Sequence, residues 1–262
     1  MWKEYSEGKQ TQKQIAKKIG KSREWVNKKF TQINCDIHKN HSIKPQEIVL
    51  IIDTTYFKKF GVMAFRSSNL KENLLWYKVA HETNELYRKG IQELIDDGWK
   101  ILAIVADGKR GLNKLFPHTP FQLCQFHQFQ IITRYISKKP QLEASKELRK
   151  LMFLMKQTDR ASFEYWLIEW YKKWEDFLGE KTINILTNKK SFTHKRLRQA
   201  YFSLRRNLPY LFTFEKHFKE FEIPTTTNSL DGYFSHLKSK ISVHRGASKN
   251  TQLKLISSMV FK

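Results

Sequence analysis

Two aspartates, Asp53 and Asp107, each come directly after a run of apolar residues. The runs, 48–52 and 101–106, are typical of strands buried on both faces of a sheet. We predict that both strands end at these aspartates and that the two ends share one crevice. Carboxylates held close together repel each other, and a bound divalent cation relieves the repulsion. The pattern therefore predicts a site for Mg²⁺, or for Mn²⁺ as its substitute, that acts on substrate phosphates.

Each aspartate also has a structural interpretation when it is taken alone. Asp107-Gly108, for example, is a common turn dipeptide. The joint placement of both carboxylates after apolar strands favours the functional interpretation. A third acid at the same place would complete a pair of metal ions about 3.5–4 Å apart, one activating the attacking oxygen and one stabilising the leaving oxygen.

Four motifs occur in a fixed order along the chain. They are Ile52-Asp53-Thr54-Thr55-Tyr56-Phe57, Ala106-Asp107-Gly108, Cys124-Gln125-Phe126-His127 and Thr227-Asn228-Ser229-Leu230-Asp231. The set resembles the Mutator-like (MULE) superfamily of insertion-sequence transposases, over residues 45–245. The Cys-x-x-His and Thr-x-Asn-x-x-acid motifs are the most specific parts of the resemblance.

The resemblance implies an RNase H-like core that cuts DNA at the ends of a mobile element. Such a core joins the freed 3′-hydroxyl to target DNA. The family's roles assign catalysis and the binding of two metal ions to Asp53, Asp107 and Asp231. The family's supporting motif beside the site corresponds to Cys124, His127 and Asn228.

One residue departs from the family's pattern. The third acid is ordinarily Glu, whereas Asp231 has a side chain that is one methylene shorter. Mg²⁺ demands near-ideal geometry, and a misplacement of about 1 Å can cost on the order of a hundredfold in rate. The leading hypothesis is an active, metal-dependent transposase. The alternatives are a catalytically decayed transposase that serves as a DNA-binding protein or regulator, and a nuclease or recombinase on the same core.

The charge of the chain favours a nucleic-acid partner. Lys and Arg number 48 against 25 Asp and Glu, which gives a net charge of +23 and a pI of about 9.9. Such a surplus repels itself unless a polyanion neutralises it, so we expect a nucleic-acid partner. The resemblance implies that this partner is double-stranded DNA, both element ends and target. The alternative is a basic protein that is merely soluble.

The N-terminal residues predict a small helix-turn-helix. Thr11 and Gln14 form a potential capping box, Gly20 ends the first helix, and Ser22 caps the second. This unit is basic, which suits phosphate contacts by Lys21, Arg23 and Lys28. The alternative is a packing hairpin with a solvated basic face.

Two further basic segments are candidates for DNA contact. The first, 187–214, holds aromatic residues between its cations and contains no acid. The second follows Asp231. For both segments the alternative is a basic surface that contacts only solvent. The candidate contacts are Lys189, Lys190, Lys195, Arg196, Arg198, Arg205 and Arg206 in the first segment, and Lys238, Lys240 and Arg245 in the second. The aromatic residues of the first segment are Phe192, Tyr201, Phe202 and Tyr210.

These elements predict an α/β fold with a mixed sheet, and the resemblance implies that this sheet is RNase H-like. Three antiparallel strands come first, then a helix and two strands that extend the sheet in parallel. After residue 140 helical periodicity takes over, and a stripe formed by Trp166, Trp170 and Trp174 favours helix core over base stacking. The expected organisation is 1–40 helix-turn-helix and connector, 41–139 first part of the core, 140–222 all-helical insertion, and 223–262 C-terminal helix and tail of the core.

The two cysteines exclude a disulfide framework and indicate a reducing compartment. Cys35-x-x-His38 and Cys124-x-x-His127 have spacings that also suit zinc, but only spacing supports this, and we favour core packing or support of the acids. The polar N-terminus lacks an apolar signal core, and the apolar runs are too short to cross a bilayer. We expect a cytoplasmic, nucleoid-associated prokaryotic protein that forms a homo-oligomer on DNA, without a membrane partner.

Overall fold

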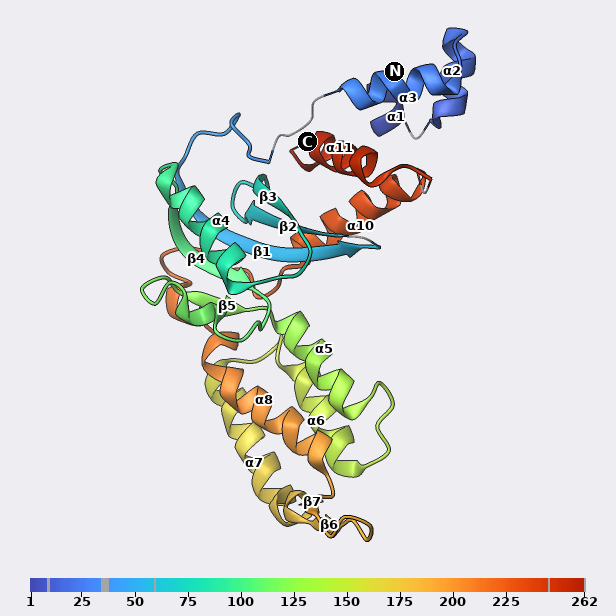
Figure 1. Ribbon diagram of the computed structural model, residues 1–262. Helices are drawn as coiled ribbons and strands as arrows, with labels where there is room; N and C mark the ends of the chain where they lie inside the picture. Colours follow the sequence, from blue (N-terminus) through green and yellow to red (C-terminus); the bar gives the residue numbers. More distant parts are fainter. Residues whose placement is uncertain (9, 34–37, 59, 245, 262) are drawn as a thin grey trace. The chain divides into compact units, whose positions relative to one another are not determined.

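The computed structural model describes residues 1–8, 10–33, 38–58, 60–244 and 246–261, and it divides into two compact units (Figure 1). One unit comprises Met1–Leu102 and Asn228–Lys262, and the other comprises Ala103–Thr227. Among the described residues, no helix has the length and apolar composition needed to cross a membrane.

The chain has an α/β fold with a mixed five-stranded sheet in the order β3-β2-β1-β4-β5. The strands are β1 Glu47–Phe57, β2 Phe60–Ser67, β3 Asn73–Val79, β4 Lys100–Ala106 and β5 Phe121–Leu123. β2 is antiparallel to both β1 and β3, whereas β4 and β5 are parallel. The predicted order of three strands, a helix (α4, Asn84–Asp96) and two further strands is confirmed, and a short helical turn (η1, Leu112–Lys114) lies between the last two strands. This topology is compatible with an RNase H-like fold.

The predicted end of the first strand is wrong. β1 does not stop at Asp53 but continues to Phe57, because its second half pairs with β2 through to Phe57 opposite Phe60. The residues after Asp53 are β-branched or aromatic, and such side chains suit a strand. Asp53 is therefore a mid-strand residue, whereas Asp107 directly follows β4 as predicted.

Helices cover both faces of the sheet in the first unit. Gly90 of α4 lies directly over the Phe65 ring of β2, whose Cζ is 2.1 Å from the position that a Cβ on Gly90 would occupy. Val62, three residues earlier on β2, points to the opposite face. It belongs to the buried cluster that includes Leu237 and Ile241 of α10 (Asn228–Ser242).

Three short helices precede the sheet and belong to the same unit: α1 Trp2–Ser6, α2 Gln12–Ile19 and α3 Arg23–Gln32. The capping box of Thr11 with Gln14 is present, Gly20 ends α2 in the left-handed conformation with φ 65°, and the Ser22 side chain caps α3. Val26 and other buried side chains of these helices join one cluster with α10 and α11 (Lys249–Val260).

Helices dominate the second unit, where α5, α6, α7 and α8 lie side by side (Figure 1). They span Gln125–Ile136, Glu143–Leu154, Arg160–Gly179 and Lys195–Leu211, and the short α9 spans Phe214–His217. The core role predicted for the tryptophan stripe is confirmed for Trp170, which is buried and donates from Nε1 to the Ala144 carbonyl; Trp166 and Trp174 are half-buried.

The expectation that strands are absent from 140–222 is wrong. β6 (Lys181–Ile183) and β7 (Lys190–Phe192) form an antiparallel hairpin between α7 and α8. The strands have three residues each and contain lysines and hydroxyl side chains, so they carry no apolar run or alternation that periodicity detects.

Candidate functional site

Asp53 and Asp231 lie on two elements of the first unit that pack against each other. Asp53 is opposite Ala64 in the β1–β2 ladder, so both side chains point to the same face of the sheet. Val62 shares this face because it lies two residues from Ala64 on the same strand. α10 packs against β1 on this side, and Asp231 lies in the first turn of α10.

The two carboxylates have different surroundings. Asp53 is 8% exposed, and its Oδ1 accepts the Thr54 amide hydrogen at 2.8 Å. Asp231 Oδ2 is buried and has no hydrogen-bond partner among the described residues. A buried carboxylate oxygen without a partner costs free energy, and an ion or water is the usual explanation for such an atom. The arrangement is suited to a cation beside Asp231.

Asp107 belongs to the second unit, where it begins a turn at the end of β4. Its Oδ1 accepts the Lys109 amide hydrogen at 3.2 Å, which fixes the turn. Ala106 pairs with Leu123 in the parallel β4–β5 ladder, and the Cys124 amide donates to the Ala106 carbonyl at 2.8 Å. Asp107 and Cys124 are therefore the next residues on two paired strands.

Cys124 connects β5 to the segment that leads into α10. Its sulfur accepts the Thr227 amide hydrogen at 3.4 Å and lies 3.6 Å from Thr227 Oγ1. Both residues are fully buried. A backbone bond from the Gln125 amide to the Thr225 carbonyl, 2.9 Å long, holds the same segment. The residue after Thr227 is Asn228, the first residue of α10.

His127 modifies the chemistry of this thiol. Burial of Cys124 on its own raises the thiol pKa, but hydrogen bonds from His127 and Thr227 outweigh burial and lower the pKa below its ordinary value. The residue spacing explains the contact, because Cys124 caps α5 and His127 lies in its first turn. The sulfur of Cys124 therefore contacts Thr227, and the supporting role that the resemblance implies for Cys124 and His127 stays a prediction.

The predicted acids are thus divided between the units, with Asp53 and Asp231 in one and Asp107 in the other. Within the part of the chain that the structure describes, no three His, Cys, Asp or Glu side chains are gathered closely enough to hold a metal ion. The Cys35 half of the alternative zinc set lies outside the described residues, and His38 is instead paired with Glu93 at 3.5 Å.

Most of the predicted DNA contacts reach solvent. The exposed ones are Lys21, Arg23, Lys28, Lys189, Lys190, Lys195, Arg196, Arg205, Arg206 and Lys238. Arg198 and Lys240 are half-buried, and Arg245 lies outside the described residues. Two of the aromatic residues interleaved with them pack inward: Tyr201 is buried and stacks on Tyr171 at 4.4 Å, and Tyr210 packs edge-on against Phe121.

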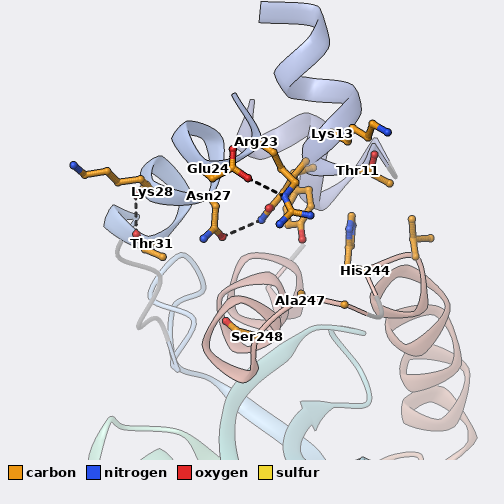
Figure 2. A pocket seen from close by; sticks show the side chains of 14 residues that line it. Thr11, Lys13, Arg23, Glu24, Asn27, Lys28, Thr31, His244, Ala247 and Ser248 are labelled. Atoms are coloured by element: carbon orange, nitrogen blue, oxygen red, sulfur yellow. Dashed lines mark hydrogen bonds and ion pairs between the residues drawn. The ribbon is translucent and has the colours of Figure 1, made fainter. Parts of the chain in front are cut away.

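A groove of about 720 Å³ lies between α2, α3 and the segment after α10, all within the first unit (Figure 2). Lys13, Arg23 and Lys28 line it together with Asn27 and the buried His244. Sequence reasoning missed Asn27 and His244. Asn27 lies four residues after Arg23 on the same helix, and this spacing was the signal that could have found it. His244 reaches the groove only through tertiary packing, which no local pattern indicates.

Comparison with protein-family models finds no match, and comparison with curated proteins finds none either.

Proposed function

We propose that this protein is a metal-dependent DNA transposase. The observation that carries the proposal is the placement of Asp53 and Asp231. Both acids are on the same side of the sheet, on elements in contact, and Asp231 has a buried oxygen without a partner among the described residues. Two carboxylates on one side of the sheet support a site for a divalent cation.

In this proposal Asp53 and Asp231 would hold Mg²⁺, and Asp107 is the third acid that the motif resemblance implies. The two donors of the first unit fit, because carboxylate oxygens are the ligands that Mg²⁺ prefers and because Asp231 Oδ2 has no competing partner among the described residues. When bound, the metal ions activate an attacking oxygen and stabilise the leaving oxygen of a phosphodiester.

Cys124 and His127 act as positioning residues. The Cys124 sulfur contacts Thr227, and Asp231 follows Thr227 by one turn of helix. In the proposal this contact sets where α10 begins and therefore how Asp231 is presented. Asn228 is the first residue of α10 and directly follows Thr227.

The N-terminal helices would serve as the helix-turn-helix that recognises element ends. The short turn from Gly20 to the Ser22 cap supports this helix-turn-helix assignment. The cations Lys13, Arg23 and Lys28, which line the groove between α2, α3 and the segment after α10, support it too (Figure 2). The helical segment around α5–α8 would be the insertion between the second and third acids, and its basic α8 would hold DNA.

A decayed transposase that only binds DNA is the second candidate, and one observation favours it. The third acid is Asp231 rather than the longer Glu of the family that the motifs resemble. Mg²⁺ tolerates little displacement of its ligands, so the shorter side chain needs a compensating approach of α10.

The test is to separate cleavage from binding. Asp53→Asn and Asp107→Asn should each abolish metal-dependent nicking of supercoiled plasmid while leaving the Kd for duplex DNA within about threefold, less than 1 kcal/mol. Asp96→Asn, an exposed surface aspartate at the end of α4, is the matched control and should nick normally. Normal nicking by either active-site variant would refute the assignment.

A further inference from the structure

One face of α8 combines cations with an exposed aromatic ring. Lys195, Arg198, Phe202 and Arg206 recur at helical spacing, with Gln199 and Ser203 between them. Together with Tyr135 of α5 and Phe192 of β7, they line a pocket of about 390 Å³ within the second unit. Among the described residues that line it, none is acidic. The volume lies within the range of small-ligand sites.

The walls of this pocket are fixed by contacts among its lining residues and with residues behind them. Phe202 packs edge-on against Tyr201 and Tyr171, at ring separations of 5.1 and 6.3 Å, and is nevertheless 39% exposed. The Arg198 guanidinium lies over the Phe192 ring at 3.8 Å from its centroid and over the Phe202 ring at 5.3 Å, and it donates to the Leu178 carbonyl at 3.0 Å. Arg198 is therefore a pre-positioned planar cation, and less ordering is needed when a ligand binds.

We propose that this pocket, hereafter the α8 pocket, binds an unpaired nucleotide of a DNA strand. The inference rests on the proposed function for its choice of ligand. The base would stack on the ring of Phe202, and Lys195 and Arg206 would contact the phosphates on either side. Gln199 has both donors and an acceptor for a base edge.

The chemistry favours a single strand over a duplex. In a duplex the base faces are stacked on one another, so a recessed aromatic ring has no base face to contact. Unpaired bases usually bind where exposed aromatic rings lie between cations. The rings stack on the bases, and the cations contact the negatively charged phosphodiester groups between them. A fully solvated basic helix would need no exposed Phe between its arginines.

The experiment measures the Kd of the full chain for short fluorescent oligothymidylate and for a duplex of matched length. Phe202→Ala should weaken single-strand binding by between about 5-fold and 100-fold, and duplex binding much less. Phe202→Trp should retain single-strand binding because it keeps a stacking ring, whereas Phe202→Leu should lose it despite similar hydrophobicity. Tyr165→Ala, which removes a 62% exposed ring of α7 outside the pocket, is the matched control.

Charge is tested in the same titration. Arg206→Gln should reduce the slope of log Kd against log salt by roughly 0.7 for single strands, and Lys156→Gln, an exposed lysine outside the pocket, should reduce it by less. Equal single-strand Kd values for Phe202→Ala and wild type would overturn the inference, as would equal losses in Phe202→Ala and Tyr165→Ala. Absence of duplex binding and of nicking by wild type, with single-strand binding intact, would instead refute the proposed function alone.

Discussion

Replacing Cys124 by alanine tests whether this buried sulfur positions the segment that leads into α10. The substitution removes the acceptor of the Thr227 amide hydrogen and the contact to Thr227 Oγ1. It also removes the hydrogen bond with His127 that lowers the pKa of the thiol. No backbone strain is introduced, because alanine occupies the same helix-capping position without a new steric demand.

The expected magnitude follows from burial. Loss of a buried hydrogen-bond partner costs about 1–3 kcal/mol, and removal of one buried heavy atom adds about 1 kcal/mol. Cys124 and Thr227 are both fully buried, so water does not replace the lost contacts without rearrangement. We expect a loss near 3 kcal/mol, which corresponds to a fall in melting temperature of roughly 6–12 °C for a chain of this size. Cys124→Ser should lose less, because its hydroxyl still accepts from the amide.

The assay is thermal unfolding followed by circular dichroism, together with plasmid nicking well below the melting temperature. The expected order of stability is wild type, then Cys124→Ser, then Cys124→Ala. Nicking should fall in the same order, because Asp231 follows Thr227 by four residues. An alanine variant that melts and nicks like wild type would refute the idea that the sulfur positions α10.

Two further predictions concern the first unit. Gly90→Ala should lower the free energy of unfolding by about 1–3 kcal/mol in chemical denaturation, because its Cβ would lie 2.1 Å from the buried Phe65 ring. Adding Phe65→Leu should recover part of this loss. Burial lowers the pKa of His244 from its ordinary 6.5, and a backbone hydrogen bond with Tyr5 opposes this shift. As pH falls, the imidazole of His244 is therefore protonated in the unfolded chain before it is protonated in the folded chain. Stability should hold above pH 6.5 and decline as pH falls from 6.5 toward the lowered pKa; a His244→Phe variant that declines equally in pH-dependent melting would contradict this.

Local signals account for the parts of the fold that were predicted. The Thr11–Gln14 capping box, the Gly20 stop and the Ser22 cap depend on neighbours within a few residues, and all three are present. Apolar runs likewise predicted β1 and β4, because strands buried on both faces need such runs.

Tertiary pairing accounts for what sequence reasoning missed. β1 continues beyond Asp53 because β2 supplies a partner, and the β6–β7 hairpin forms from residues without an apolar pattern. Tyr201 lies among cations in the sequence but faces inward, where it stacks on Trp170. Helical phase rather than composition separates it from the exposed Phe202.

For the candidate site too, local sequence signals predicted some features and tertiary pairing decided the others. Motif spacing singled out Asp53, Asp107, Cys124 and Asp231, but no local pattern indicates which face of β1 carries Asp53. The β1–β2 register decides this, since a shift of one residue would turn Asp53 to the α4 side. The contact of Cys124 with Thr227 joins residues 103 positions apart and likewise depends on the fold.

The most direct test of the central claim is nicking of supercoiled plasmid with Mg²⁺ or Mn²⁺ by wild type, Asp53→Asn and Asp231→Glu. The account predicts metal-dependent nicking by wild type that disappears in Asp53→Asn, with Asp231 acting as the third acid. No nicking by wild type, with nicking restored by Asp231→Glu, would show a transposase that has lost catalytic activity. Silence in all three proteins, with duplex binding intact, would contradict the claim of catalysis and leave a DNA-binding protein.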